Sequence, residues 1–165
     1  DRTAWNQQLT DVVARWSPDA VALMGFMKVL GAPFLERFDR RILNVHPALL
    51  PAFPGAHGAA DALAAGVRIT GCTVHLVDAG VDTGDIVAQA AVPVLADDTA
   101  DTLQARIQVA EHRLFPAVLS ALATGALTLS PVRWRTETAA AVEAAGTAVP
   151  SVETAVLYSP MPDGS

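Results

Sequence analysis

Residues 20–47, AVALMGFMKVLGAPFLERFDRRILNVHP, alternate between strand-like and helix-like segments. Residues 20–24 are apolar on both faces, which is typical of strands in a parallel sheet that helices cover. Residues 33–38 are expected to form a short helix, and residues 41–45 form the next predicted strand, which runs directly into a histidine and a proline. This alternation predicts an α/β protein.

The segments on either side continue the pattern. An amphipathic helix is predicted over residues 3–16, with Thr3 as its N-cap, and another helix over residues 59–65. The apolar face of the first helix is expected to contain Trp5, Leu9, Val12, Val13 and Trp16.

The sequence from residue 69 onward predicts two strands, a long helix and a further strand. Residues 69–77 and 86–94 predict an antiparallel pair, because a turn-rich loop joins them. The long helix is expected from the N-cap Thr99 to about Ala123, and residues 127–134 predict a last strand. The buried stripe of the long helix is expected to contain Leu103, Ile107, Ala110, Leu114, Val118 and Leu122.

The composition excludes several classes of protein. The 165 residues include 11 Lys+Arg and 17 Asp+Glu, which gives a net charge of −6, and 52% are hydrophobic. Such a chain is expected to form one folded domain, and its acidic balance disfavours nucleic acid as the main partner. The single cysteine excludes an internal disulfide, and no apolar run of about 18 residues predicts a membrane helix. We therefore expect a cytoplasmic protein.

Two polar residues, Asn44 and His46, bracket Val45 at the carboxyl end of a predicted strand. Alternate strand residues share a face, so both side chains can project into one cleft at the sheet edge where α/β proteins bind ligands. An amide can donate to a developing oxyanion and a histidine can exchange a proton near neutral pH, which suits acyl or formyl transfer. The alternative interpretation is that Asn44 caps a turn and His46 simply precedes Pro47.

A second polar cluster, DAGVDTGD at residues 78–85, contains three acids. One acid held near a histidine would orient the ring and stabilise the imidazolium. Asp82 is the central candidate, but spacing does not separate it from Asp78 or Asp85. The segment lacks the downstream glutamate of the common calcium loop, and a solvated turn is the alternative. We expect no metal site, since no two histidines have the spacing of zinc ligands.

Two further reactive side chains, Cys72 and His75, lie within the predicted strand at residues 69–77. The apolar and β-branched neighbours of Cys72 predict a core residue rather than a nucleophile. We expect His75 to be packed or hydrogen-bonded on the strand.

Several motifs occur in a specific order along the chain. NVHP at residues 44–47 is followed by LLPAFPGAH at residues 49–57. The other motifs are GFMKVL at 25–30, GCTVH at 71–75, VDTG at 81–84 and QVAEHRLFP at 108–116. Together they closely resemble the phosphoribosylglycinamide formyltransferases, the folate-dependent family of purine synthesis, over about residues 1–127.

This resemblance implies a Rossmann-like formyltransferase fold, with a mostly parallel sheet, helices on both faces and an antiparallel C-terminal strand pair. It also implies transfer of a formyl group from the co-substrate 10-formyltetrahydrofolate to the amine of 5-phosphoribosylglycinamide, without a metal. The family's catalytic residues fall on Asn44, His46 and Asp82. Asn44 would stabilise the tetrahedral oxyanion, His46 would assist it and move protons, and Asp82 would orient His46 and favour its charged form.

The resemblance also assigns binding residues. The folate-binding residues would be Arg2, Met27, Lys28, Val29, Leu30, Asn44, Ala79 and Val81. The ribonucleotide-binding residues would be Gly25, Val45, Pro47 and Glu111. The implied partners are these small molecules, with no nucleic acid and no membrane, and a homodimer remains open.

The domain organisation follows from the extent of the resemblance. The catalytic domain is expected over residues 1–130, followed over residues 131–165 by a partly irregular extension that is rich in Ala, Glu, Pro and Ser from Thr136 onward. The family begins with a strand and a phosphate-binding loop that have no counterpart in this sequence. The resemblance therefore implies that this N-terminal portion is absent and that the ribonucleotide phosphate has no evident cradle.

Three alternative functions remain open. Methionyl-tRNA formyltransferase and formyltetrahydrofolate deformylase share the same three catalytic residues. The acidic balance of the residues after Ser130 disfavours a tRNA-binding extension. The alternative from another class is a non-catalytic fragment that binds folate.

Overall fold

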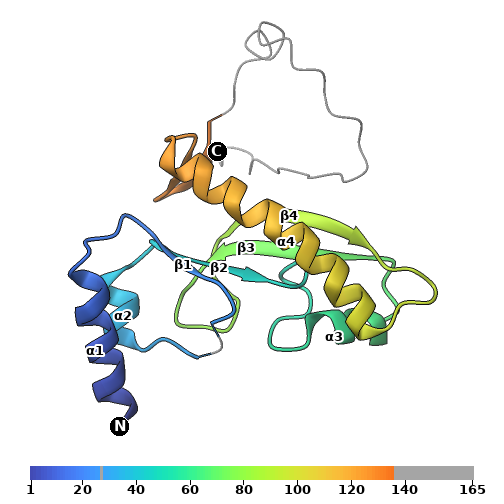
Figure 1. Ribbon diagram of the computed structural model, residues 1–165, viewed down its shortest axis with the longest axis horizontal. Coiled ribbons are helices and arrows are strands. Elements are labelled where there is room, and N and C mark those ends of the chain that lie inside the picture. The colour runs from blue at the N-terminus through green and yellow to red at the C-terminus, as the bar shows by residue number, and fades with distance from the viewer. Residues whose placement is uncertain (27, 136–165) are drawn as a thin grey trace, which may run out of the picture.

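The structure is a computed structural model that describes residues 1–26 and 28–135, in which helices and strands alternate (Figure 1). The elements are, in chain order, α1 (Arg2–Ala14), β1 (Val21–Leu23), α2 (Ala32–Arg37), β2 (Ile42–His46), α3 (Gly58–Ala64), β3 (Ile69–Leu76), β4 (Ile86–Pro93), α4 (Ala100–Ala123), β5 (Leu127–Leu129) and β6 (Val132–Trp134). The predicted α/β architecture is confirmed. Most of the predicted extension, residues 136–165, lies outside the described residues.

Four strands form a mixed sheet in the order β1-β2-β3-β4. The predicted antiparallel pairing of β3 with β4 is confirmed, and β2 also pairs antiparallel with β3. Among the strands that the structure describes in this sheet, only β1 and β2 are parallel, because α2 forms the crossover between them, whereas the loop from β3 to β4 returns the chain directly. Within the described residues the sheet is thus less parallel than expected.

Helices cover both faces of the sheet, as expected (Figure 1). On one face, α4 packs on β3 and β4 around Leu103, Ile107 and Val118. On the other, Phe34 of α2 packs against Ile42 of β2, and α1 lies beside α2. Since successive strand residues point to opposite faces, β2 contributes to both cores and its polar end lies between them.

Helix α1 buries only part of the predicted face. Its N-cap is Asp1, whose side chain accepts from the Thr3 backbone N–H, so the prediction of Thr3 as N-cap was wrong. Leu9 and Val13 of that face pack against the core as predicted, whereas Val12 and Trp16 are exposed. The fully buried residues of the helix are Asn6 and Thr10. These two polar side chains can be buried because both have hydrogen-bond partners. The spacing of apolar residues in the sequence does not reveal such partners.

Helix α4 and the segment after it agree with the sequence in part. Thr99 is the N-cap of α4, and the predicted stripe is buried except for Leu122, which is half-buried. Residues 127–134 are a hairpin of β5 and β6 rather than one strand, because Ser130 and Pro131 form the turn between them. No helix in the described residues is both long and apolar enough to cross a membrane.

Candidate active site

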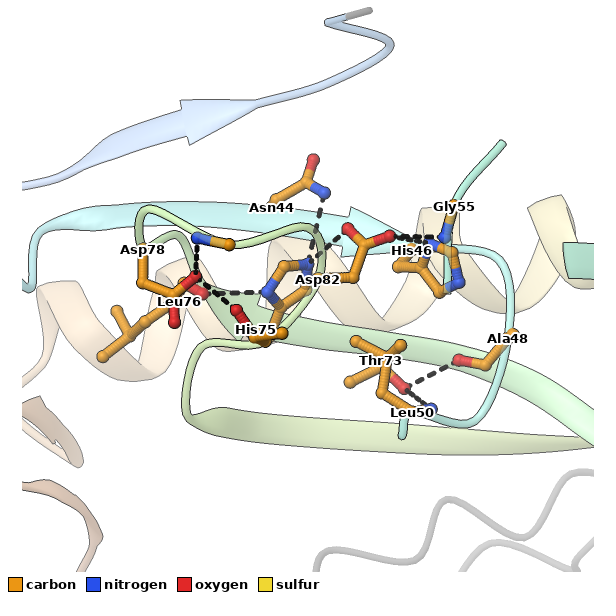
Figure 2. Close-up of polar contacts among 12 residues, drawn as sticks. Asn44, His46, Ala48, Leu50, Gly55, Thr73, His75, Leu76, Asp78 and Asp82 are labelled. Atoms are coloured by element: carbon orange, nitrogen blue, oxygen red, sulfur yellow. Dashed lines mark hydrogen bonds and ion pairs between the residues drawn. The ribbon is translucent and has the colours of Figure 1, made fainter. Parts of the chain in front are cut away.

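Asn44 and His46 lie two residues apart on β2, opposite His75 and Thr73 of β3. Figure 2 shows Asp82 reaching towards them from the loop between β3 and β4. The structure therefore brings together the three side chains that the sequence singled out for catalysis, although Asp82 follows His46 by more than thirty positions.

Both ring nitrogens of His46 face oxygen atoms. Nδ1 lies 3.3 Å from Oδ2 of Asp82, and Nε2 lies 2.8 Å from the carbonyl oxygen of Phe53. A carbonyl and a carboxylate only accept hydrogen bonds, so the doubly protonated ring satisfies both contacts with its two N–H groups. The side chain is only 4% exposed, so these two contacts fix the orientation of the imidazole.

The two residues whose oxygens face His46 have unusual backbone conformations. Phe53 and Asp82 both have a φ of 54°, in the left-handed region that residues with side chains rarely adopt. The carboxylate of Asp82 also accepts from the backbone N–H of Gly55 at 2.8 Å. The surrounding structure thus holds two strained positions around one imidazole, a feature that is common at functional sites.

His75 belongs to the same cluster. It is buried, and its Nδ1 lies 2.8 Å from the carbonyl oxygen of Leu76, to which it donates. Burial lowers the pKa of His75, which keeps the ring neutral and leaves a lone pair on Nε2. That lone pair accepts from Nδ2 of Asn44 at 3.3 Å, so the expectation of a hydrogen-bonded histidine is confirmed.

The four side chains form a continuous series from Asn44 through His75 and Asp82 to His46 (Figure 2). Oδ1 of Asp82 approaches Nε2 of His75 at 3.6 Å, which is a close contact rather than an ion pair because that ring is neutral. An amide nitrogen carries two N–H groups, so one can donate to His75 while the other donates to a ligand oxygen. His75 thus determines which end of the Asn44 amide is a donor.

The sequence did not identify His75 as part of this cluster. The two predicted strands, residues 41–45 and 69–77, can pair so that His75 lies opposite Asn44. This neighbourhood was missed because the pairing register of the two strands was not predicted.

The three acids of the 78–85 loop have separate roles. Oδ1 of Asp78 accepts from the Gly80 backbone at 3.0 Å and from Oγ1 of Thr83 at 2.7 Å, which ties the loop together. Asp85 accepts from Nη2 of Arg40 at 2.8 Å. Only Asp82 faces the imidazoles, so the structure resolves the choice that spacing left open.

Thr73 fixes the proline-rich loop that follows His46. Its Oγ1 donates to the carbonyl oxygen of Ala48 at 2.7 Å and accepts from the backbone N–H of Leu50 at 3.0 Å. Gln89 donates to the carbonyl oxygen of Leu50 at 2.9 Å. These contacts anchor the loop that supplies Phe53 to the imidazole, and the sequence did not predict them.

Two other titratable residues lie near the cluster. Cys72 is fully buried, and burial raises the pKa of its thiol to about 12, which confirms the predicted core role. Burial raises the pKa of Glu111 on α4, and the nearby imidazoles of His112 and His46 oppose that rise. Within the described residues, no three His, Cys, Asp or Glu side chains are grouped so that they could hold a metal ion.

Four of the eight expected folate-binding residues line one of two cavities. One, of about 560 Å³, lies between α2 and the loop after β3 and is lined by Leu35, Val77 and Ala79 among others. The second, of about 490 Å³, is lined by Arg2, Trp5, Lys28 and Val29. Neither lining includes Asn44, His46 or Asp82.

The remaining predicted binding residues differ in exposure. Val81 is 63% exposed, whereas Leu30 is buried in the core beside Phe34, so its side chain is not free to line a ligand site. Met27 lies outside the described residues. The predicted ribonucleotide contacts comprise exposed Gly25, which follows β1, and half-buried Val45, Pro47 and Glu111.

The neutral state of His75 predicts a pH dependence of stability. Its pKa in the folded protein lies below the ordinary value of 6.5, so below about pH 6.5 the unfolded chain binds a proton that the folded protein does not. The contribution of the neutral His75 ring to the free energy of unfolding is complete above that pH. It is lost as the pH falls through the lowered pKa, by up to about 1.4 kcal/mol per pH unit. The free energy of unfolding, measured with urea at several pH values between 7.5 and 5, should fall less steeply with decreasing pH in His75→Gln than in the wild type. An equally steep fall in both proteins would contradict the neutral ring.

The chain is similar to known proteins over most of its length. The profile of the formyl transferase family matches residues 1–119. The chain is 58% identical over 128 residues to a phosphoribosylglycinamide formyltransferase from Mycobacterium tuberculosis, a match that covers 78% of this chain and 60% of the relative. It is 43% identical over 129 residues to the human trifunctional purine biosynthetic protein adenosine-3, covering 78% of this chain and 13% of that protein.

Solved structures show the same likeness. A glycinamide ribonucleotide transformylase from Symbiobacterium toebii superposes with a TM-score of 0.78 at 45% identity, covering 82% of this chain and 65% of that one. A phosphoribosylglycinamide formyltransferase from Streptococcus pneumoniae superposes with a TM-score of 0.71 at 48% identity, covering 74% of this chain and 68% of that one. The chain spans about 60% of the length of the curated bacterial relative that it matches. On this evidence the chain belongs to the formyl transferase family.

Proposed function

We propose that this chain carries the catalytic centre of a phosphoribosylglycinamide formyltransferase. The reaction moves the formyl group of 10-formyltetrahydrofolate to the amine of 5-phosphoribosylglycinamide. The observation that carries this proposal is the series of contacts from Asn44 to His46, in which an amide donor, a neutral imidazole, a carboxylate and a second imidazole follow one another. The names of the relatives support the choice of substrates.

Each catalytic group has a role in the tetrahedral mechanism. The substrate amine attacks the formyl carbon and forms a C–N bond, which places negative charge on the formyl oxygen. Asn44 donates an N–H to that oxygen, and the His46 imidazolium adds positive charge beside it. Asp82 balances the imidazolium. The intermediate then loses its bond to N10 of the folate as the amine proton leaves and N10 gains a proton.

We further propose that folate binds along the two cavities beside α2. The cavity lined by Leu35, Val77 and Ala79 combines these apolar side chains with polar and charged ones, which suits a flat heterocycle that carries hydrogen-bond donors and acceptors. The second cavity carries the guanidinium of Arg2 and the ammonium of Lys28, which suit the carboxylates of the folate tail. The predicted ribonucleotide contacts lie nearer the end of β2, where Val45 and Pro47 flank His46.

An assay with three acceptors tests the proposed function. Tetrahydrofolate release from 10-formyltetrahydrofolate is measured with 5-phosphoribosylglycinamide, with methionyl-tRNA and with water alone. We expect release that depends on the ribonucleotide, and an unchanged rate in Asp61→Asn, which alters an exposed acid of α3. Release in water alone would instead indicate a deformylase, and release that requires the tRNA would indicate the tRNA enzyme. Folate binding without any release would indicate a non-catalytic module.

A further inference from the structure

A buried amide on α1 contacts the segment that precedes α2. Asn6 is only 5% exposed, and its Oδ1 accepts from the backbone N–H of Gly31, the N-cap residue of α2, at 2.7 Å. Its Nδ2 donates to the carbonyl oxygen of Arg2 at 2.9 Å, so both ends of the amide are satisfied. A side chain at position 31 would lie 2.8 Å from Cγ of Asn6, so this close approach requires glycine.

The same face of α1 makes two further contacts with this segment. Nη2 of Arg2 donates to the carbonyl oxygen of Val29 at 3.2 Å, and Nζ of Lys28 lies 4.9 Å from the centre of the Trp5 ring. Residues 2, 5 and 6 share one face because of the helical repeat. The Arg2 contact is exposed, whereas the Asn6 contact is short and buried, so Asn6 provides the strongest of the three restraints.

We propose that Asn6 is a positioning residue that fixes residues 28–31 and so shapes the cavity lined by Arg2, Trp5, Lys28 and Val29. The Gly31 hydrogen bond sets the end of the segment, which in turn places the Lys28 ammonium over Trp5 and beside Arg2. The inference that Asn6 affects folate binding rests on the proposed function. The inference that Asn6 fixes the backbone of residues 28–31 does not.

Three variants test the role of Asn6. Asn6→Ala removes the acceptor for the Gly31 N–H, whereas Asn6→Asp retains an acceptor oxygen there. Thr10→Val is the matched control, because Thr10 is also a buried polar residue of α1 but donates only within the helix, to the carbonyl oxygen of Asn6 at 2.8 Å. General destabilisation of α1 would weaken protection of the Gly31 amide in both Asn6→Ala and Thr10→Val. Loss of a specific restraint from Asn6 would weaken it only in Asn6→Ala.

Hydrogen exchange of the Gly31 amide, followed by NMR, is the first measurement. We expect exchange about tenfold faster in Asn6→Ala, since a tenfold change corresponds to about 1.4 kcal/mol, the size of one lost hydrogen bond. Exchange in Asn6→Asp and Thr10→Val should remain within about threefold of the wild type. Equal exchange in Asn6→Ala and the wild type, or equal acceleration in Thr10→Val, would overturn the proposal. If Asn6→Ala does not fold, lost protection in Asn6→Asp would also overturn it.

Calorimetry with 10-formylfolate, an air-stable analogue, is the second measurement. We expect affinity about tenfold weaker in Asn6→Ala and near wild type in Asn6→Asp, with the KM for the ribonucleotide unchanged in both. Faster Gly31 exchange without any loss of affinity would overturn the claim that Asn6 shapes the cavity. If the wild type does not bind 10-formylfolate, the proposed function fails, and Gly31 exchange alone decides whether Asn6 holds the segment.

Discussion

Replacement of Asn44 by aspartate is expected to lower kcat/KM for formyl transfer about a thousandfold, with most of the loss in kcat. Removal of one oxyanion donor costs about 10²–10³ in kcat, and the new carboxylate adds a negative charge where negative charge develops. The carboxylate also cannot donate to the Nε2 lone pair of His75, which accepts from Asn44 at 3.3 Å. Steady-state kinetics with both substrates varied would measure the loss and separate kcat from KM.

The control for this variant is Gln8→Glu, which makes the same change from amide to acid on an exposed position of α1. Both variants should keep the wild-type far-UV circular dichroism spectrum. A kcat/KM for Asn44→Asp within tenfold of the wild type would show that the Asn44 amide is not the oxyanion donor.

Strand periodicity predicted part of the site correctly. Asn44 and His46 share a face because alternate residues of any strand do, and the apolar residues before them made the strand itself predictable. The position of Asp82 could not be predicted in this way. Asp78, Asp82 and Asp85 are equivalent in spacing, and only the loop conformation, with a φ of 54° at Asp82, separates them. The motif resemblance chose Asp82, and the structure supplies the contacts that single it out.

Tertiary contacts determine what periodicity missed in the fold. The apolar face predicted for α1 overlaps the buried face at Leu9 and Val13 but misses Asn6, which is buried through its hydrogen bond with Gly31. Among the described strands, parallel pairing is less extensive than expected for a similar reason. Strand direction depends on how each connection crosses the sheet, and only the connection from β3 to β4 was short enough to decide the direction in advance.

Replacement of Asp82 by asparagine is expected to lower kcat/KM by about 10²–10⁴, the range for loss of a group that supports acid–base catalysis. The new amide has nearly the same shape, and its oxygen can still accept from the Gly55 N–H, which lies 2.8 Å from the native carboxylate. That oxygen takes the place of Oδ2, which also faces Nδ1 of His46, so the amide NH₂ takes the place of Oδ1 and faces Nε2 of His75. The variant thus keeps the contacts of the imidazole but removes the negative charge that balances a proton on His46 during the reaction.

Two measurements test this prediction together. Steady-state kinetics give the loss in kcat/KM, and far-UV circular dichroism shows whether the variant keeps the wild-type fold. Asp97→Asn is the comparison, since it removes an equal charge at an exposed position after β4 and lines neither cavity. We expect its loss in kcat/KM to be at least tenfold smaller than that of Asp82→Asn. Equal losses would show that the total charge of the protein, rather than the carboxylate beside His46, supports the reaction.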